Sequence, residues 1–352
     1  MARIRTKDIA QKAGVSLGTV DRVLHNRGGV SEKSRQKVLS IMKELGYEPN
    51  RYASALASNR KFSFACLIPS HFPGEYWEQV EEGLKDGAAG FADLGTELSF
   101  CYYDSFDYPT FGKAGSSVLE GEHDAVIIGP TVKEHTMPFI TELERRSIPY
   151  IFVDATIEGA SPLAYFAQHA IMSGYFTAGI VLPLRLPQGG KVAVFETSRR
   201  SHTGSNQQVS REEGFRKWIS DNDAEVSLVK VSLPSTRDKA KDNDILSEFF
   251  CSNPDIKTGV FFNSRAYIVG EYLRENGIKD FDLTGYDLLP SNVRCIREGG
   301  ISRLISQRPH EQGYGVVKAL CEKLILKKTI KVANDMPIDL LNRDNLEFYL
   351  QA

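Results

Sequence analysis

The sequence predicts an all-α helix-turn-helix head joined to an α/β body that consists of two doubly wound parallel-sheet lobes. Three observations support this fold class. The chain has 352 residues, which is too long for one compact core and suits two or three domains. Residues 1–60 show helical patterns throughout, whereas from residue 62 onward apolar runs of strand length alternate with helical stretches. The roughly 290 residues of that alternation exceed one doubly wound sheet and suit two.

The composition is that of an ordinary globular protein. Hydrophobic residues make up 41% and charged residues 25%, which excludes a wholly disordered or collagen-like chain. No apolar run approaches the roughly 18 residues that a membrane span needs. The segment MARIRTKDIA at the N-terminus lacks the apolar core of a signal peptide, so we expect a cytoplasmic protein without a membrane partner. The five cysteines are scattered and form no C-x-x-C pair, which indicates reduced thiols and no metal site.

The net charge of −2 hides an asymmetry along the chain. Residues 1–60 contain 12 Lys and Arg against 5 Asp and Glu, while the rest of the chain contains 31 against 40. A basic head on an acidic body indicates that the head alone contacts a polyanion. An ordinary solvated basic helical domain would show the same charge, so the sequence pattern has to decide between the two.

The first two helices of the head have the helix-turn-helix pattern. Thr6 is expected to cap a short helix over residues 7–13, which Gly14 ends. Ser16 then caps a second helix over residues 17–24. Two short helices joined by a turn of about four residues allow the second helix to enter a DNA major groove.

Two further helices complete the head. Ser31 is expected to cap a third helix that Gly46 closes, and a fourth short helix covers residues 51–58. Eight residues without a packing partner cannot hold a helix, so the fourth segment should be loose in the free protein. The expected core side of the third helix consists of Val38, Leu39, Ile41, Met42 and Leu45.

Three runs of the head form a nearly continuous pattern: TKDIAQKAGVSLGTVDRVL from Thr6, VSEKSRQKVL from Val30 and LGYEPNRYASALA from Leu45. Over the first 58 residues this pattern resembles the DNA-binding head of the LacI/GalR family of bacterial transcription regulators. The resemblance implies a transcriptional repressor that binds a palindromic double-stranded DNA operator as a homodimer. It also implies a head over residues 1–48, a hinge helix over 49–61 and an effector-binding domain over 62–352.

The resemblance assigns roles to single residues of the head. Leu17 and Gly18 correspond to base-reading positions, and Arg22 to a residue that reaches a base edge or a phosphate. Leu56 corresponds to the residue wedged into the minor groove, and Ala53 to the small residue that lets two hinge helices approach. The residues that correspond to phosphate contacts are Thr6, Ser16, Thr19 and Asn26.

Structural roles remain open as alternatives for some of these residues. Ser16 and Thr19 could serve capping and packing, and Leu56 could be a core leucine. Two positions depart from the family pattern, because Asp21 replaces a common Ser and Gly18 shortens a reading side chain. Asp21 is expected to accept from a cytosine amino group or to pair with Arg22 or Arg27, so the operator sequence stays undetermined.

The body is predicted from alternating strands and helices, which argues for parallel sheets covered by helices on both faces. The expected strands cover residues 62–68, 98–103, 125–128, 149–153, 191–195, 226–231, 259–262 and 283–286. The expected helices include 77–91, 174–184, 214–219 and 266–275.

Polar and aromatic residues follow the apolar runs, where parallel sheets bind their ligands. Carboxylates, amides and a guanidinium beside an aromatic face suit a polyhydroxyl ligand, because forked groups bridge hydroxyls and a ring stacks on a pyranose. Each residue alone has a plainer explanation, such as a helix cap, a surface charge or a core tryptophan. The expected effector-binding residues are Tyr76, Trp77, Asp154, Arg211, Asn263, Asp287 and Gln307.

The same segments resemble the effector domain of the family, which is similar to type I periplasmic sugar-binding proteins. The resemblance implies one lobe over about 62–165 and 308–327, and a second over about 166–307 and 328–352. A small carbohydrate-like effector is expected to control DNA binding allosterically. Ser264 and residues 168–170 depart from the family pattern, so the effector's identity, and whether it acts as inducer or corepressor, stays open.

Two other function classes remain as alternatives. One is a regulator that senses a purine or another nucleobase stacked on Tyr76 and Trp77. The other is a sugar-binding protein or enzyme with a vestigial head. The sequence contains no G-x-x-x-x-G-K-[ST], no G-x-G-x-x-G after a strand and no H-E-x-x-H, so we expect no catalytic residues, no cofactor and no metal.

Overall fold

The structure is a computed structural model that describes residues 4–24, 27–47, 51–58, 60–107, 109–185, 189–198, 205–234 and 238–351. The chain divides into two compact units, residues 1–60 and 61–352, and each is described by itself. The division lies next to residue 62, where the body was expected to begin. No helix in these described ranges is long and apolar enough to cross a membrane.

The described part of the head contains four helices, and its small core forms where the first three meet. The core consists of Ile9, Ala10, Ala13, Val20, Val23, Val38 and Ile41. Two expected caps are confirmed, because Ser16 Oγ accepts from the Thr19 N–H at 3.1 Å and Ser31 Oγ from the Ser34 N–H at 3.2 Å. The helices are α1 (Thr6–Ala13), α2 (Leu17–Leu24), α3 (Glu32–Leu45) and α4 (Arg51–Ser58).

Two expectations for the head are wrong. Thr6 is the first residue of α1 and not its cap; Arg5 precedes the helix, and its N–H donates to Asp8 Oδ2 at 2.8 Å. Leu39 is 49% exposed because it lies one position past the buried Val38, which turns it about 100° away from the core. The segment of α4 is helical, and its loosening in the absence of DNA stays a prediction.

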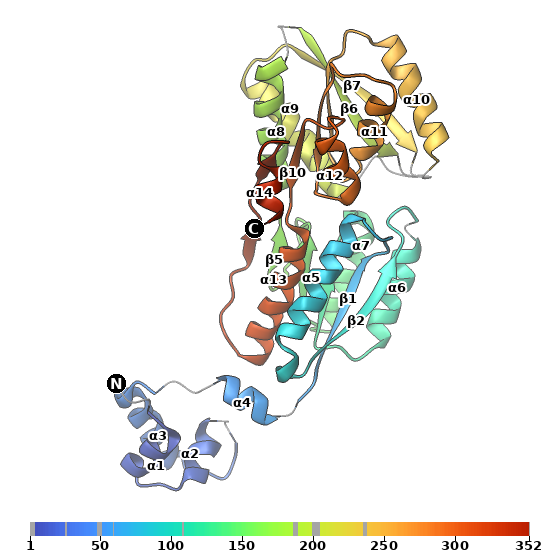
Figure 1. The fold of residues 1–352 in the computed structure, drawn as a ribbon. Helices are drawn as coiled ribbons and strands as arrows, with labels where there is room; N and C mark the ends of the chain where they lie inside the picture. Colours follow the sequence, from blue (N-terminus) through green and yellow to red (C-terminus); the bar gives the residue numbers. More distant parts are fainter. Residues whose placement is uncertain are drawn as a thin grey trace. The chain divides into compact units, whose positions relative to one another are not determined.

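The first lobe of the body is built on a six-stranded parallel sheet of order β11-β5-β4-β3-β1-β2 (Figure 1). Helices α6 and α7 share a hydrophobic cluster with the sheet, while α5 and α13 pack against each other and contact β2, β4 and β5. The strands are β1 (Phe62–Pro69), β2 (Thr96–Tyr103), β3 (Ala125–Ile128), β4 (Tyr150–Asp154), β5 (Tyr165–Ala167) and β11 (Ala333–Asp335). The helices are α5 (Tyr76–Gly90), the short η1 (Ala92–Leu94), α6 (Pro109–Glu120), α7 (Lys133–Arg145) and α13 (Pro309–Leu320), which a short π-helix, η2 (Cys321–Ile325), extends.

The second lobe repeats this plan with the order β12-β10-β9-β8-β6-β7. All its pairs are parallel except β10 with β12, which is antiparallel. The strands are β6 (Gly190–Ser198), β7 (Val226–Pro234), β8 (Thr258–Phe261), β9 (Asp282–Tyr286), β10 (Arg303–Ser306) and β12 (Asp339–Leu341). The helices are α8 (Ala170–Arg185), α9 (Asn206–Asp221), α10 (Lys239–Ser252), α11 (Tyr267–Glu275), α12 (Pro290–Arg297) and α14 (Leu346–Leu350).

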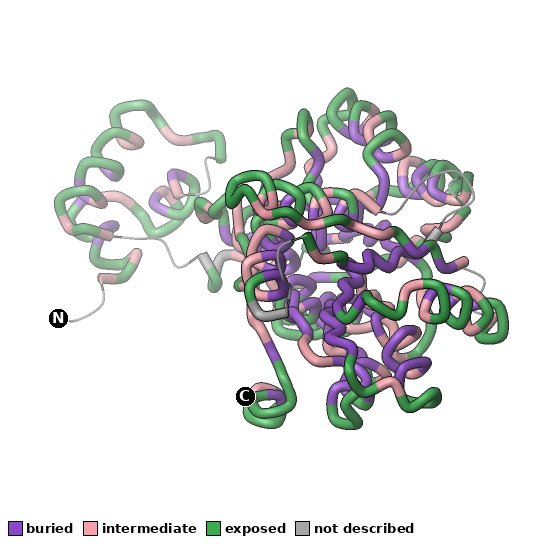
Figure 2. Tube along the Cα trace, turned by 90° about the horizontal axis from the view of Figure 1, so that it is seen from above, coloured by how far each residue is buried: buried purple, intermediate pink, exposed green. Residues whose placement is uncertain are grey.

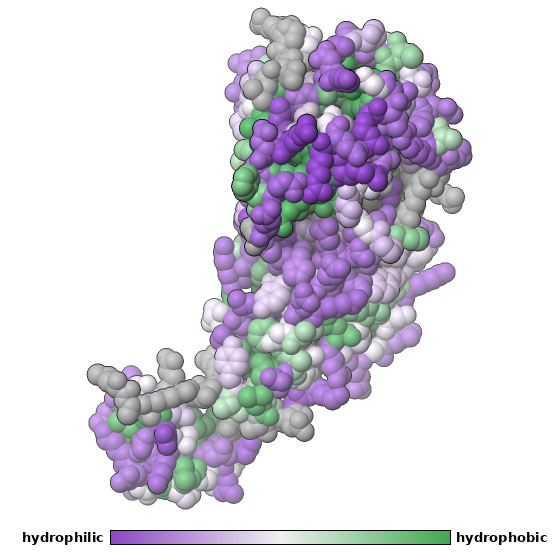
Figure 3. Space-filling model, viewed as in Figure 1, coloured by the Kyte–Doolittle hydropathy of each residue, from purple (hydrophilic) through white to green (hydrophobic). Residues whose placement is uncertain are grey.

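Helices cover both faces of the second sheet because its strands are apolar on both sides. In β6, Ala193 and Phe195 face the cluster made with α10, α11 and α12, whereas Val192 and Val194 face the cluster made with α8 and α9. Burial is therefore concentrated in the sheets, and the outer helix faces are exposed (Figure 2). Hydrophilic residues cover most of the visible face of the body, with apolar surface in small patches (Figure 3).

The chain crosses between the lobes three times: after β5, after β10 and between β11 and β12. The second crossing agrees with the expected position of Gln307. The third lies later than expected, because residues 333–335 pair with β5 in the first sheet and only residues 339–341 join the second. Such three-residue edge strands carry too few apolar residues to be recognised in the sequence.

Candidate functional site

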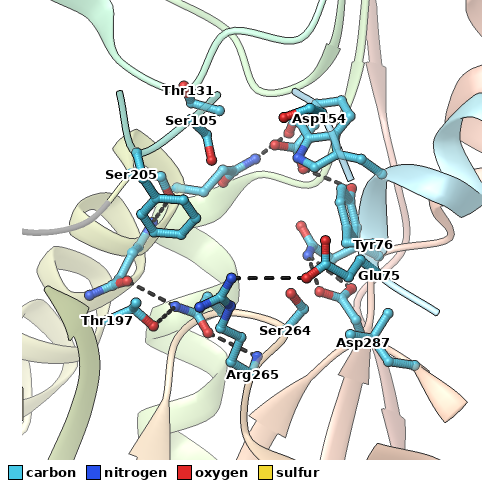
Figure 4. A pocket seen from close by; sticks show the side chains of 18 of the residues that line it. Glu75, Tyr76, Ser105, Thr131, Asp154, Thr197, Ser205, Ser264, Arg265 and Asp287 are labelled. Atoms are coloured by element: carbon cyan, nitrogen blue, oxygen red, sulfur yellow. Dashed lines mark hydrogen bonds and ion pairs between the residues drawn. The ribbon is translucent and has the colours of Figure 1, made fainter. Parts of the chain in front are cut away.

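A cleft of about 680 Å³ lies between the two lobes, at the carboxyl ends of their strands. All seven residues expected to bind the effector line it: Tyr76, Trp77, Asp154, Arg211, Asn263, Asp287 and Gln307. Figure 4 shows Tyr76, Asp154 and Asp287 gathered on one side of the cleft, with Thr197 and Ser205 on the other. Residues from both lobes and from one crossover therefore share a single site.

Two aspartates occupy equivalent places in the two lobes. Asp154 ends β4 and Asp287 follows β9, and these strands have the same position in their sheets. Both residues have a left-handed backbone, with φ of 74° and 68°. This conformation is uncommon for residues other than glycine, and it turns both side chains away from the strand direction into the cleft.

Asp154 is held by three neighbours. The Tyr76 hydroxyl donates to Asp154 Oδ1 at 2.7 Å, the Asp154 N–H donates to Gln312 Oε1 at 2.9 Å, and the Gln207 amide donates to the Asp154 carbonyl. Burial raises the pKa of Asp154, although the Tyr76 hydrogen bond and the Arg211 charge oppose it. Burial also raises the pKa of Tyr76, and the carboxylates nearby add to this. The phenol therefore stays protonated and remains a donor.

Gln307 joins Asp287 to Arg211. Its amide nitrogen lies 2.9 Å from both Asp287 carboxylate oxygens, and its oxygen accepts from Arg211. Arg211 also donates to the Phe262 carbonyl at 2.8 Å and lies 4.1 Å from the ring centroid of Tyr286. Burial raises the pKa of Asp287 to about 7, against the opposing effects of Arg211 and Gln307. Arg211 is only 2% exposed. Its hydrogen bonds to Gln307 and Phe262 fix the plane of the guanidinium.

Asn263 and Trp77 complete the predicted set. Asn263 Nδ2 lies 3.3 Å from Thr197 Oγ1 and 3.2 Å from Gln208 Oε1, which fixes the orientation of the amide. The Trp77 ring lies edge-on to Tyr76, with centroids 5.6 Å apart, and it is partly exposed in the cleft. A partly exposed ring beside hydrogen-bonding groups can stack on the apolar face of a sugar.

Several residues of the site lie outside the set that the sequence predicts. Gln312 is fully buried and connects Asp154, Tyr76 and Gln307, but it lies within a helix and carries no local signal. Arg265 follows a strand end, so the reasoning that found Asn263 could have found it. Its guanidinium lies 4.0 Å from Glu75 Oε1 (Figure 4). It also lies 5.0 Å from the Phe106 ring centroid, and both partners belong to the first lobe.

The cleft has an excess of acidic groups. Its two guanidiniums are both engaged, Arg211 by Gln307 and Arg265 by Glu75. No cluster of His, Cys, Asp and Glu that could hold a metal occurs in the described ranges. Hydroxyls both donate and accept, so they match this mixture of acceptors and donors. The carboxylates that line the cleft are Glu75, Asp104, Asp107, Asp154 and Asp287.

The head places its predicted base-reading residues on one exposed face of α2. Leu17, Gly18 and Arg22 are exposed, while Val20 and Val23 fill the core on the opposite face. This division gives the helix one packed side and one side open to a partner.

The hydroxyls of Ser16 and Thr19 at the start of α2 have local partners. So does Asp21, which departs from the family pattern. Ser16 Oγ and Thr19 Oγ1 lie 3.0 Å apart, which supports the capping role proposed for them. Asp21 pairs with Arg27 at 3.2 Å, one of the two arrangements expected for it. An exposed ion pair at this position can rearrange when a base is presented.

The other residues of the head that the sequence predicts to contact DNA are distributed over α1, α4 and a part of the chain that the structure does not describe. Thr6 is half-buried at the start of α1, and Ala53 is exposed on α4. Leu56 is 52% exposed, so the alternative of a core leucine is wrong. Asn26 lies outside the described residues.

Comparisons with known proteins cover nearly the whole chain. Residues 6–50 match the family of bacterial regulatory proteins called lacI, and residues 64–328 match the periplasmic binding protein domain. A solved Bacteroides fragilis protein assigned to the LacI transcriptional regulators is 39% identical, with a TM-score of 0.78, over 82% of this chain and 100% of that chain. GanP, a glucose-galactose binding protein from Geobacillus stearothermophilus, shares the fold at 19% identity and a TM-score of 0.70, over 82% of this chain and 99% of that chain.

Sequence relatives agree with this assignment. The ribose operon repressor of Bacillus subtilis is 24% identical over 96% of this chain and 97% of that protein. The transcriptional regulator DegA of the same organism is 32% identical, but the match spans only 42% of each chain. A lacI head and a periplasmic binding protein body occur in one polypeptide, and the protein therefore belongs to the LacI family of bacterial transcriptional regulators.

Proposed function

We propose that the protein represses transcription in the cytoplasm as a homodimer bound to a palindromic operator, under the control of a carbohydrate that binds in the cleft. The lining of the cleft is the observation that supports a carbohydrate as the effector. Forked side chains from both lobes line the same cleft as a partly exposed indole ring, a combination that suits a pyranose with adjacent hydroxyls. The repressors and sugar-binding proteins among its relatives support the same assignment.

Control of DNA binding follows from linkage between the two units. A ligand that contacts both lobes favours one orientation of the lobes over others. It shifts the equilibrium between orientations only to the extent that it binds one of them more tightly. In a dimer, the lobe orientation sets the separation of the two hinge helices and hence their fit in the minor groove. Coupling of about 1–3 kcal/mol is typical for such systems.

The effector half of the proposal is tested by thermal shift. Monosaccharides, polyols, phosphosugars, uronates and nucleobases are screened with the full-length protein, and a neutral monosaccharide is expected to raise the melting temperature. Arg211→Ala should abolish the shift, because Arg211 orients Gln307 in the cleft wall. Arg216→Ala is the matched control, since Arg216 lies on the same helix with its side chain 52% exposed. A shift produced by nucleobases alone would support the alternative effector class.

The DNA half is tested by footprinting and by binding to genomic fragments at near-physiological salt. Full-length protein should protect a palindromic site, and Arg22→Ala should lose the preference over random competitor while keeping the effector shift. Lys43→Ala provides a control on the exposed side of α3. Protection of no palindrome by the wild type, with or without effector, contradicts the proposal and favours a sugar-binding protein with a vestigial head.

A further inference from the structure

One buried side chain ties together the three segments through which the chain crosses between the lobes. Gln168 belongs to the first crossing, directly after β5, and is 2% exposed. Its Nε2 donates to the carbonyl of Ser306 at 3.0 Å, where the second crossing leaves β10. The same nitrogen donates to the carbonyl of Pro337 at 2.8 Å, in the third crossing between β11 and β12. A single amide therefore contacts all three crossings.

The partners of Gln168 fix which way its amide points. Carbonyl oxygens can only accept, so the amide nitrogen has to face Ser306 and Pro337. The amide oxygen then faces Ser173 Oγ at 2.8 Å, and the Ser173 hydroxyl donates to it. Because a hydroxyl has one proton, the Tyr286 hydroxyl, 3.0 Å from Ser173 Oγ, donates to Ser173. The hydrogen bonds of Gln168 thus continue into the second lobe as far as Tyr286.

Two routes lead from this amide to the wall of the cleft. By one route, the ring centroid of Tyr286 lies 4.1 Å from the guanidinium of Arg211. By the other, Ser306 is followed in the chain by Gln307, whose side-chain oxygen accepts from Arg211. Both routes end on Arg211, which lines the cleft, whereas Gln168 is not part of the lining. Gln168 therefore lies between the effector site and the crossings.

Burial makes these contacts specific for one arrangement of the crossings. A buried polar group that loses its partner cannot replace it with water, so moving the crossings apart costs free energy. Four residues of this network are at most 3% exposed: Gln168, Ser173, Tyr286 and Ser306.

Two other contacts each join two of the crossings. The Met336 N–H, in the third crossing, donates to the Ala167 carbonyl at 2.9 Å, next to the first. Arg308, in the second, pairs with Asp339 at 2.6 Å, at the end of the third. Loss of the Gln168 amide should therefore loosen the crossings without separating the lobes, and the Met336 amide reports such loosening.

We propose that Gln168 is a positioning residue that couples the cleft to the three crossings, so that an effector in the cleft moves them as one unit. This inference rests on the proposed carbohydrate control of DNA binding and adds the side chain through which that control passes. Without the amide, the effector should still bind, but it should lose part of its influence on the operator.

The first experiment needs no effector. Hydrogen exchange of the full-length protein is followed by mass spectrometry in peptides that contain Met336. Gln168→Met keeps the side-chain size and removes its hydrogen bonds, so it should speed this exchange by about 10-fold. Thr177→Val is the matched control and should exchange as the wild type, because Thr177 is 1% exposed and its hydroxyl bonds within the second lobe, to Ser173 and Tyr286.

The second experiment measures the coupling itself, since contact alone does not establish it. The operator affinity of the full-length protein is measured with and without a saturating concentration of the neutral monosaccharide that gives the largest shift in the thermal-shift screen. Saturation removes any effect of altered sugar affinity from the ratio of the two operator affinities. This ratio should move toward one by about 3-fold in Gln168→Met. Ser173→Ala, which breaks the link to Tyr286 and leaves both crossing bonds, should change the ratio similarly but exchange as the wild type at Met336.

The outcomes separate this inference from the function on which it rests. Wild-type exchange at Met336 in Gln168→Met, or equally fast exchange in Thr177→Val, overturns the role of the amide at the crossings. An affinity ratio that differs from one in the wild type and persists in Gln168→Met and Ser173→Ala overturns this inference alone. If Gln168→Met does not fold, the ratio in Ser173→Ala decides. A wild-type ratio of one for every carbohydrate overturns both proposals.

Discussion

At the scale of the residue, Asp154 and Asp287 show how burial sets the chemistry of the cleft. The Asp154 carboxylate accepts from the Tyr76 hydroxyl, and the Asp287 carboxylate accepts from the Gln307 amide, which separates it from Arg211. Neither carboxylate forms an ion pair within the described part of the chain. Desolvation therefore dominates, and it raises the pKa of both carboxyls. With a pKa of about 7, the Asp287 carboxyl can both donate to and accept from a hydroxyl of a ligand near neutral pH.

Asp287→Asn should change the pH dependence of stability. The folded pKa of Asp287 is about 7 and its usual value is 3.8, so between these pH values the folded state holds a proton that the unfolded state has lost. The free energy of unfolding therefore falls as pH rises through this window, by at most about 4 kcal/mol. The variant should be more stable than the wild type at pH 8 and close to it at pH 4.

Thermal unfolding of both proteins from pH 4 to 8 checks this expectation. The exposed variant Asp244→Asn should keep the wild-type profile. Parallel profiles for Asp287→Asn and the wild type would show that Asp287 titrates in the folded protein as it does in the unfolded chain.

All seven residues that the sequence predicts to bind the effector line the cleft. For Asp154, Asn263, Asp287 and Gln307 the strand-end rule explains this, because the carboxyl ends of parallel strands meet at one sheet edge. It could not find Gln312, whose position depends on how α13 packs beside β4, 158 residues away in the chain. Nor could it find Gln207, which reaches the other lobe. Which side chains of these helices reach the cleft depends on how distant elements pack, and the local sequence does not show this.

At the scale of the element, glycines set how closely the helix pairs approach. A Cβ on Gly174 of α8 would lie 1.8 Å from the Arg211 carbonyl oxygen of α9, and one on Gly214 would lie 1.9 Å from the Ile171 oxygen. In the first lobe, Gly83 and Gly313 bring α5 and α13 together in the same way. A Cβ added to either glycine would lie 2.0 or 2.2 Å, respectively, from a backbone oxygen of the other helix. The close pair α8–α9 therefore fixes where Arg211 enters the cleft.

Gly174→Ala should destabilise the body by about 1–3 kcal/mol, because a methyl group against a backbone oxygen forces the two helices apart. It should also weaken effector binding, since the shift moves Arg211. Gly112→Ala in α6 is the matched control: nothing lies within 4 Å of its added Cβ, so it should stabilise by about 0.5–1 kcal/mol. Denaturant unfolding measures both, and equal effects of the two variants would contradict the close-packing explanation.

At the scale of the whole molecule, contacts across the cleft join the two lobes. The Asn206 N–H donates to the Thr131 carbonyl at 3.0 Å, and the Gln207 side chain donates to the Asp154 carbonyl. Both donors belong to the first turn of α9, directly after the Ser205 cap. The start of this helix is therefore, with Arg265, a part of the second lobe that contacts the first.

Gln207→Leu should shift the free body toward more open arrangements, because it removes one of these contacts at similar side-chain size. A net hydrogen bond of about 0.5–1.5 kcal/mol corresponds to a change of about 2- to 10-fold in the ratio of open to closed forms. Small-angle scattering without ligand should show a larger radius of gyration. Gln208→Leu is the control, since Gln208 bonds Asn263 within the second lobe, and an equal expansion in that variant would assign the effect to lost packing.

The division into two compact units predicts that residues 61–352 fold and bind effector without the head. Each lobe of this unit has its own clusters of buried side chains, and every residue of the cleft lining lies within it. The fragment should melt cooperatively and show the same effector-induced shift as the full chain, while losing all preference for the operator. The full chain should show a binding affinity for DNA that falls steeply with salt, since its basic head releases counterions from the phosphates. An effector shift that disappears on removal of residues 1–60 would mean that the head completes the cleft, and control would then act by direct contact between the units instead of through the lobes.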